Sequence, residues 1–344
     1  SLCNTNSAIK VTAWYAVGKI GEKIATKEVI DKLVIALTDE NAKIRKSACD
    51  AVGNIGEKAA TKEVIDKLVI ALTDENFLVR KSAYDAVDRI GEKIATKEVI
   101  DKLVIALTDE NAKIRKSACD AVGNIGEKAA TKEVIDKLMA ALTDENEEVR
   151  ESAYDAVGKI GEKAATKEVI DKLVISLTDE DANIRRYACY AVRNIGEKAA
   201  TKEVIDKLMA ALTDENEEVR ESACYAVGKI GEKAATKEVI DKLVISLTDE
   251  DANIRRYACY AVGNIGEKAA TKEVIDKLMA ALTDENEEVR ESACYAVGKI
   301  GEKAATKEVI DKLVIALTDE DANIRRYACY AVGKIGEKAA TKEV

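Results

Sequence analysis

Residues 21–55 read GEKIATKEVIDKLVIALTDENAKIRKSACDAVGNI, and this stretch decides the fold because the chain repeats it almost unchanged. The tripeptide Gly-Glu-Lys recurs every 35 residues from Gly21 to Gly336. Nine complete units span residues 21–335, residues 1–20 form a leading half repeat, and residues 336–344 match the start of a truncated repeat. A fixed period of this length is typical of stacked supersecondary units. We therefore predict one repeat array over residues 1–344.

The first half of each unit predicts an amphipathic helix. Val29, Leu33 and Ala36 recur at helical spacing and form one apolar stripe. Thr26 is the expected N-cap, because its hydroxyl can accept a hydrogen bond from a free amide of the first turn. The opposite face carries lysine, glutamate and aspartate. We expect that face to be in contact with solvent.

A second helix is expected after the polar turn of residues 38–41, with Asn41 as its cap. Its predicted buried stripe consists of Ile44, Ala48, Ala51, Val52 and Ile55. Gly56 is expected to end the helix, because glycine adopts the left-handed conformation without a steric penalty. Neither helix can bury its stripe alone, so each pair must pack on the next pair.

Each complete unit also carries an aspartate in the inter-helix turn and an arginine six residues later, as in Asp39 with Arg45 and Asp319 with Arg325. With the preceding leucine and the ending Ala-Val-Gly-x-Ile-Gly, this pattern resembles the HEAT repeat, particularly the short HEAT-like repeats of phycobilisome-lyase type. The resemblance covers nearly the whole chain. It implies an all-α fold, a right-handed α-solenoid of antiparallel two-helix repeats.

In that family the aspartate and the arginine form a ladder between adjacent units, and the second helices line the concave side. The resemblance carries the ladder role onto Asp39, Arg45 and their equivalents. The leading half repeat departs from the pattern, with Asn4 and Lys10 at these positions. The chain also contains no proline, which is common in the turns of HEAT units.

The exposed face of the second helix differs between the two halves of the array. Lys43, Lys46, Asp50 and Gly53 lie opposite the buried stripe, so we expect all four to be exposed. From residue 161 onward, tyrosine replaces Asp50 in every unit, at Tyr190, Tyr225, Tyr260, Tyr295 and Tyr330. Such a row offers rigid amphipathic contact area and favours protein interfaces.

We therefore predict that a partner protein or peptide binds along the concave face. The predicted contact residues are Arg186, Tyr187, Tyr190, Tyr225, Arg256, Tyr257, Tyr260, Tyr295, Arg326, Tyr327, Tyr330 and Phe77. An alternative interpretation is structural. Arg186, Glu221, Arg256, Glu291 and Arg326 alternate in sign, so neighbouring helices could pair across the stack while the tyrosines pack on the arginine stems.

A few departures interrupt the repeat. Residues 161–230 and 231–300 differ only at Arg193 and Gly263, and such near-identical copies suit a repetitive partner better than a unique active site. Asp88 stands at the same glycine position. Phe77 and Leu78 are either an interface anchor or pack on an adjacent turn. Trp14 replaces the usual cysteine or tyrosine, and we expect it to plug the end of the array.

The composition argues against catalysis and against cofactors. The chain has no histidine, which excludes Ser-His and Cys-His nucleophilic pairs. Gly-Glu-Lys lacks the Gly-Lys-Ser/Thr ending of a phosphate-binding loop. The eight cysteines include no close Cys-x-x-Cys pair, so we expect no zinc site and reduced thiols, as in a cytoplasmic protein. No apolar run is long enough to span a membrane.

Other functions remain open. The net charge of -10 disfavours nucleic-acid binding, for which Lys43, Lys46, Lys81, Lys113 and Lys116 are the candidates. The resemblance to phycobilisome-lyase repeats allows a bilin lyase. The regularity of the sequence also suits a structural spacer, a self-associating module, or an engineered or truncated array without a partner.

Overall fold

The computed structural model describes residues 7–336, and these form α-helices, short 3-10 helices and turns, with no strand. Asn4 and residues 337–344 lie outside the described residues. The chain divides into two compact units, Ser1–Ala164 and Ala165–Val344. The single array over residues 1–344 stays a prediction. The all-α solenoid of antiparallel helix pairs is confirmed.

Unit 1 consists of a leading helix followed by four pairs of helices. The α-helices are α1 (Ser7–Ile20), α2 (Lys27–Ala36), α3 (Ala42–Ile55), α4 (Lys62–Ala71), α5 (Phe77–Ile90), α6 (Lys97–Ala106), α7 (Ala112–Ile125), α8 (Lys132–Ala141) and α9 (Glu147–Ile160). Each long helix is followed by a single 3-10 turn, at Gly21–Ile24, Gly56–Ala59, Gly91–Ile94, Gly126–Ala129 and Gly161–Ala164.

Unit 2 consists of five pairs of helices with the same alternation of lengths. They are α10 (Lys167–Ser176), α11 (Ala182–Ile195), α12 (Lys202–Ala211), α13 (Glu217–Ile230), α14 (Lys237–Ser246), α15 (Ala252–Ile265), α16 (Lys272–Ala281), α17 (Glu287–Ile300), α18 (Lys307–Ala316) and α19 (Ala322–Ile335). The 3-10 turns are Gly196–Ala199, Gly231–Ala234, Gly266–Ala269 and Gly301–Ala304.

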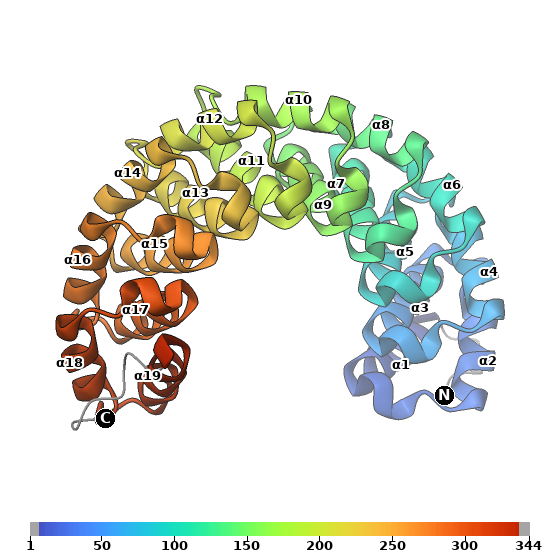
Figure 1. Ribbon diagram of the computed structural model, residues 1–344. Coiled ribbons are helices and arrows are strands. Elements are labelled where there is room, and N and C mark those ends of the chain that lie inside the picture. The colour runs from blue at the N-terminus through green and yellow to red at the C-terminus, as the bar shows by residue number, and fades with distance from the viewer. Residues whose placement is uncertain (1–6, 337–344) are drawn as a thin grey trace. The chain divides into compact units, whose positions relative to one another are not determined.

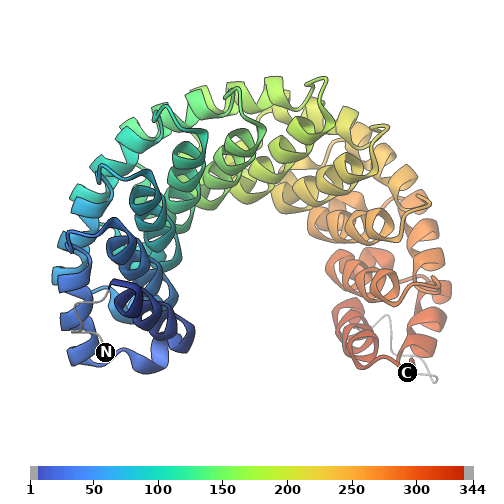
Figure 2. The same cartoon turned by 180° about the vertical axis from the view of Figure 1, so that it is seen from behind.

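Within each unit the helices form two layers, which can be followed from both sides in Figures 1 and 2. In unit 1 the first helices α2, α4, α6 and α8 form one layer, and the odd-numbered second helices form the other. Successive second helices pack closely on each other, whereas successive first helices make few contacts. Each unit therefore curves with its second helices on the inner side, as the resemblance implied.

The two predicted N-caps are confirmed. Thr26 Oγ1 accepts a hydrogen bond from the amide of Val29 at 3.4 Å, and Asn41 Oδ1 accepts one from the amide of Lys43 at 2.9 Å. Equivalent threonines cap the other first helices. Asn or Asp caps the other second helices. The turn residues therefore satisfy amides that each helix leaves free at its start.

The glycine at the end of each second helix differs from its predicted conformation in one angle. Gly56 has the expected positive φ of 70°, but its ψ of -142° is not that of a left-handed helix. This region is open almost only to glycine. It turns the chain directly into the 3-10 helix Gly56–Ala59, which the helical periodicity did not predict.

The predicted core stripes are buried except for Val29, which is half-buried in α2, and most of the cysteines lie with them. Leu33, Ala48 and Val52 are fully enclosed. The described cysteines are free; Cys329 is exposed and the other six are buried. Burial raises the pKa of Cys224 and Cys294 to about 12, so these thiols stay protonated at neutral pH.

Candidate functional site on the second helices

An arginine-aspartate ladder fixes the spacing of the second helices inside each unit. Arg45 donates from Nε and Nη2 to the two carboxylate oxygens of Asp74 in the next repeat, at 2.6 and 2.9 Å. Its Nη1 donates to the main-chain oxygen of Asp39 in its own turn, at 2.8 Å. The further rungs are Arg115 with Asp144, Arg185 with Asp214, Arg220 with Asp249, Arg255 with Asp284, and Arg290 with Asp319.

These contacts confirm the ladder that the resemblance implied. Lys10, which replaces the arginine in the leading half repeat, makes a single ion pair of 3.1 Å with Asp39. Burial alone would raise the pKa of Asp74, but hydrogen bonds from Arg45 and from the amide of Asn76 hold it below its ordinary value. The ladder is therefore structural, and its arginines are engaged within the array.

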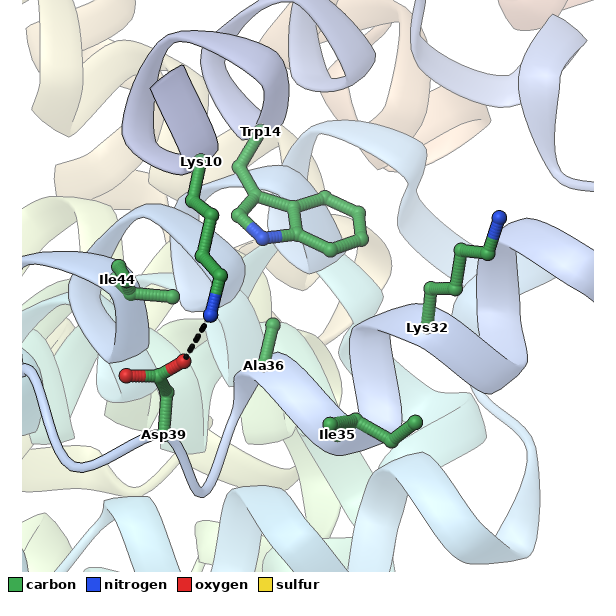
Figure 3. A pocket seen from close by; sticks show the side chains of 7 residues that line it. All are labelled: Lys10, Trp14, Lys32, Ile35, Ala36, Asp39 and Ile44. Atoms are coloured by element: carbon green, nitrogen blue, oxygen red, sulfur yellow. Dashed lines mark hydrogen bonds and ion pairs between the residues drawn. The ribbon is translucent and has the colours of Figure 1, made fainter. Parts of the chain in front are cut away.

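Figure 3 shows the beginning of unit 1, where Lys10 points toward Asp39 and Trp14 lies beside them. Trp14 takes the place of Cys49 in the next repeat and is only 2% exposed. Ala36 and Ile44 line the same small pocket. Trp14 is thus part of the core, in agreement with its predicted role as an end plug.

The predicted exposure of the second-helix face holds for Lys43, holds only in part for the half-buried Lys46 and Asp50, and fails for Gly53, which is buried. A Cβ atom on Gly53 would lie 3.0 Å from the Cα atom of Ala86 on the next second helix. Glycine is therefore needed at this position for close helix packing, and the position is not part of the exposed face.

In unit 1 three half-buried lysines of the second helices form ion pairs along their own helices. Lys46 binds Asp50 at 2.6 Å, and Lys116 binds Asp120 at 2.8 Å. Lys81 and Asp85 make the same pair at 2.7 Å. An aspartate of the same helix thus neutralises the charge of three of the five lysines that are candidates for nucleic-acid binding.

In unit 2 the tyrosine row is half-buried, and its rings contact one another from helix to helix. Tyr225 stacks on Tyr257 with ring centroids 4.7 Å apart and meets the edge of Tyr260 at 5.3 Å. Tyr260 stacks on Tyr295 at 6.0 Å, and Tyr295 meets Tyr327 edge-on at 6.0 Å. Each tyrosine of the row is therefore partly buried against the array and partly exposed to solvent. Their remaining surface lies along α11 to α19.

The arginines of this face pack on tyrosine and pair with glutamate. The guanidinium groups of Arg186, Arg256 and Arg326 lie 4.6, 4.4 and 4.8 Å from the ring centroids of the tyrosines that follow them, Tyr187, Tyr257 and Tyr327. Such contacts are typical cation-π geometry. The guanidinium groups, rather than the stems alone, therefore hold the rings.

The structural alternative is right about pairing across the stack but wrong about the partners. The direct ion pairs join Arg186 to Glu218 at 3.2 Å and Arg256 to Glu288 at 2.6 Å. Glu221 and Glu291 were the predicted partners. Burial raises the pKa of Glu221 and Glu291, because no direct ion pair offsets their loss of solvent among the described residues.

Arg193 contacts the tyrosine row of unit 2, whereas Phe77 belongs to unit 1 and lies outside the row. The Arg193 guanidinium lies 4.3 Å from the ring centroid of Tyr190 and 4.5 Å from that of Tyr225. Phe77 begins α5 in unit 1 and is half-buried beside Leu78, which is 51% exposed. Asp88, at the position of Arg193 in unit 1, accepts a hydrogen bond from Asn124.

Two surface features escaped the sequence analysis. Ion pairs join successive Gly-Glu-Lys turns, as between Lys58 and Glu22 at 2.6 Å, and the fixed period could have predicted them. Exposed isoleucines mark the solvent-facing side of many first helices, at Ile35, Ile70, Ile105, Ile175, Ile245 and Ile315. Helical spacing could have indicated their exposure, because each stands two residues after the buried leucine and outside the predicted stripe.

The described part of the chain has neither a membrane-spanning helix nor a metal-binding cluster. Across residues 7–336, no helix combines the length and the hydrophobicity of a bilayer span. In the same range, histidine, cysteine, aspartate and glutamate form no group of three or more that could hold a metal ion.

The comparisons with known proteins agree with this architecture. The family model described as HEAT repeats matches residues 2–87, 30–104, 100–189, 170–244 and 240–311. No curated protein matches the sequence. The crystal structure of an engineered protein is similar to this chain with a TM-score of 0.60 and 25% identity, covering 97% of each chain.

Two structures of nuclear import proteins have a similar fold. A structure of Kap95p with RanGDP matches with a TM-score of 0.65 and 16% identity, over 100% of this chain and 50% of that one. A crystal structure of importin beta matches with a TM-score of 0.58 and 16% identity, over 90% and 45%. The chain therefore spans about half the length of these two proteins, and the likeness concerns the fold alone.

Proposed function

The chain belongs to the family of HEAT-repeat proteins, and on that premise we propose that it is a non-catalytic scaffold that binds a partner protein or peptide along the second helices of unit 2. The observation that carries the proposal is the tyrosine row. Five consecutive second helices contribute Tyr190, Tyr225, Tyr260, Tyr295 and Tyr330, all half-buried. Tyrosine gives large contact area at low entropic cost, which suits a protein interface.

The charges around the row support a polypeptide partner. Glu217 and Glu287 are exposed at the start of their helices, and Lys229 and Lys299 are exposed near the end. A band of tyrosines between acidic and basic margins matches the usual anatomy of an interface, with an aromatic centre and a polar rim. The identity of the partner is left open by this pattern.

The other candidate functions have weaker support. The pairing of Lys46, Lys81 and Lys116 with aspartates, together with the net charge of -10, argues against a nucleic-acid partner. The absence of histidine from the sequence supports the proposal that the protein is not an enzyme. The free cysteines fit a reducing compartment such as the cytoplasm.

A displayed random-peptide library, selected on the full chain, tests the proposal. The affinity of the selected peptides is then measured by fluorescence anisotropy for wild type and for two variants. One variant replaces the five row tyrosines by Ala and the other replaces them by Leu, which retains apolar volume so that the array folds. We expect both variants to bind at least about tenfold more weakly. Unchanged affinity in the folded Leu variant would overturn the proposal.

The matched control is Tyr84 to Phe in unit 1. Tyr84 is only 3% exposed, and its hydroxyl donates to the main-chain oxygen of Leu72 at 3.2 Å. We expect this variant to lose some stability and to bind the selected peptides as wild type does. A library that yields no binding peptide favours the competing function, a spacer without a partner. That function suits the similarity to an engineered protein.

A further inference from the structure

Arg193 is the single difference between the two 70-residue copies, since residues 161–230 and 231–300 are otherwise identical. In the second copy the position is Gly263. The remaining second helices of unit 2 also carry glycine there, at Gly228, Gly298 and Gly333. A unique residue in an otherwise repeated surface gives the tyrosine row one place that differs from all others.

The glycines of this series make room for the tyrosine of the next helix. A Cβ atom on Gly228 would lie 2.7 Å from Cδ1 of Tyr260, and a Cβ atom on Gly298 would lie 2.7 Å from Cδ1 of Tyr330. At position 193 the arginine side chain occupies this space instead. The ring of Tyr225 consequently rests on the Arg193 guanidinium, which also contacts Tyr190.

The contacts of Arg193 leave part of its hydrogen-bonding capacity unused. Its Nε donates to Oδ1 of Asn194 at 3.3 Å. Among the described residues of unit 2, no carboxylate forms an ion pair with it, whereas Arg186 and Arg256 of the same surface each have a glutamate partner. Because rings cover guanidinium faces, the donors that remain lie in the guanidinium plane, where a carboxylate can accept two bonds side by side.

A second cation lies close to the same ring. Lys229 Nζ is 5.5 Å from the ring centroid of Tyr225. Its side chain is exposed, and it too has no ion pair among the described residues 165–336. Arg193 and Lys229 therefore place two uncompensated positive charges beside one tyrosine of the row. Their positive potential favours an anionic group of the partner.

We infer that Arg193 and Lys229 bind a carboxylate side chain of the partner polypeptide and so fix its register on the tyrosine row. This inference rests on the proposed function. A repetitive partner could otherwise shift by one 70-residue step, since it would meet the same side chains again. The carboxylate site removes this degeneracy, because only one such arginine is present.

The test uses two fluorescein-labelled peptides, deca-glutamate and deca-glutamine, and measures anisotropy with the full chain at low and physiological salt. We expect deca-glutamate to bind wild type more tightly than deca-glutamine. We expect Arg193→Gly to weaken deca-glutamate binding by roughly tenfold or more, and Arg193→Lys, which keeps the charge without the planar fork, to be intermediate. Arg193→Gly should fold normally, because it reproduces the native residue of the next copy.

The control for net charge is Lys113→Gln, which removes one exposed cation from unit 1. It should bind deca-glutamate as wild type does. Equal binding of deca-glutamate by wild type and Arg193→Gly, or an equal loss in Lys113→Gln, would overturn the inference.

The peptides selected from the library separate this inference from the proposed function. If the tyrosine variants lose affinity for them and Arg193→Gly does not, the register site is wrong and the scaffold function stands. If neither the tyrosine variants nor Arg193→Gly lose affinity, both are wrong. A selection of peptides with an acidic residue at one fixed position, lost in Arg193→Gly, supports both.

Discussion

The second helices of unit 1 and unit 2 share a scaffold but present different surfaces. In unit 1 the half-buried position held by Asp50 and its equivalents is aspartate, and Lys46 and Lys116 pair with it inside one helix. In unit 2 the same position is tyrosine, and rings such as Tyr260 and Tyr295 contact each other between helices. Tyrosine at this position, together with Tyr257 and Tyr327 at the position of Ser47, therefore replaces local charge pairs by ring contacts between helices.

The comparison shows that different residues determine how the repeats stack and which side chains the second helices expose. Arg45 with Asp74 in unit 1 and Arg255 with Asp284 in unit 2 make the same two hydrogen bonds, at 2.6 to 2.9 Å. The exposed face changes while this contact does not. Function should therefore depend on the surface residues, and stability on the ladder and the glycines.

Acidification should produce the largest effect, because it acts on the ladder of both units at once. The pKa values of Asp39, Asp74, Asp144, Asp214, Asp284 and Asp319 lie below the ordinary value for aspartate. The unfolded chain therefore takes up protons first, and stability falls as pH drops from about 4 through the folded pKa values. Urea unfolding at pH 7, 4 and 3 measures this loss.

The raised pKa values of Glu221 and Glu291 act in the opposite direction, because the folded chain binds those protons more readily. They should reduce the acid effect in unit 2 without reversing it. A stability that is constant between pH 4 and 3 would contradict the assigned role of the ladder.

Removal of one rung should have the next largest effect, and it should be similar in the two units. Arg115→Ala and Arg255→Ala each leave a largely enclosed aspartate without its two side-chain donors. We expect a loss of about 2 to 3 kcal/mol in the free energy of unfolding from each. Chemical denaturation followed by circular dichroism measures it.

Arg325→Ala is the matched control for this prediction. Among the described residues, the Arg325 side chain bonds only to main-chain oxygens of its own turn, those of Asp319 and Glu320. Its replacement should therefore cost less than Arg255→Ala. Equal losses in the two variants would show that the turn contacts, and not the inter-repeat ion pair, stabilise the array.

Replacement of a second-helix glycine by alanine should destabilise unit 2 more than unit 1. Gly228→Ala places a methyl group 2.7 Å from the ring of Tyr260 and 3.1 Å from Cα of Ala261, and should cost about 1 to 3 kcal/mol. Gly53→Ala in unit 1 meets backbone at 3.0 Å but no tyrosine ring, so we expect a smaller loss. Melting temperatures of the purified variants compare them.

Gly333→Ala provides the control within unit 2. Apart from the backbone of its own helix, no atom of the described residues lies within 4 Å of the added Cβ position, and the residue is inside α19. Because alanine is the better helix former, this variant should gain up to about 1 kcal/mol. A loss of stability comparable with that of Gly228→Ala would mean that backbone effects, not the tyrosine contact, control these positions.

The smallest effect is expected for the surface pairs of unit 1. Lys116→Ala removes a half-buried surface ion pair within one helix, which is worth roughly 0.3 to 0.5 kcal/mol. The loss should shrink further at high salt. A loss above about 1 kcal/mol, measured by the same urea titration, would show that these pairs contribute to the stacking of the second helices, as the ring contacts of unit 2 do.

The candidate surface was only partly predictable from its residues. The period located Tyr190 and Tyr260 on equivalent turns of successive helices, and the structure places them half-buried in one row. It could not predict that Arg256 pairs with Glu288 and not with Glu291, because both glutamates lie within reach of a flexible side chain. The burial of Gly53 was also missed, since a helical wheel does not show how closely the next helix approaches.

The sequence by itself determined the helix pairs, their caps and the period, because these depend on local spacing and on residue types at turns. Its resemblance to the HEAT family also predicted the arginine-aspartate ladder. Only the tertiary structure decided which side chains of the exposed face contact across repeats, including the position of Arg193 between Tyr190 and Tyr225. The reason is physical: such contacts depend on the distance and angle between packed helices, and residues 35 apart in the chain share no local geometry that fixes them.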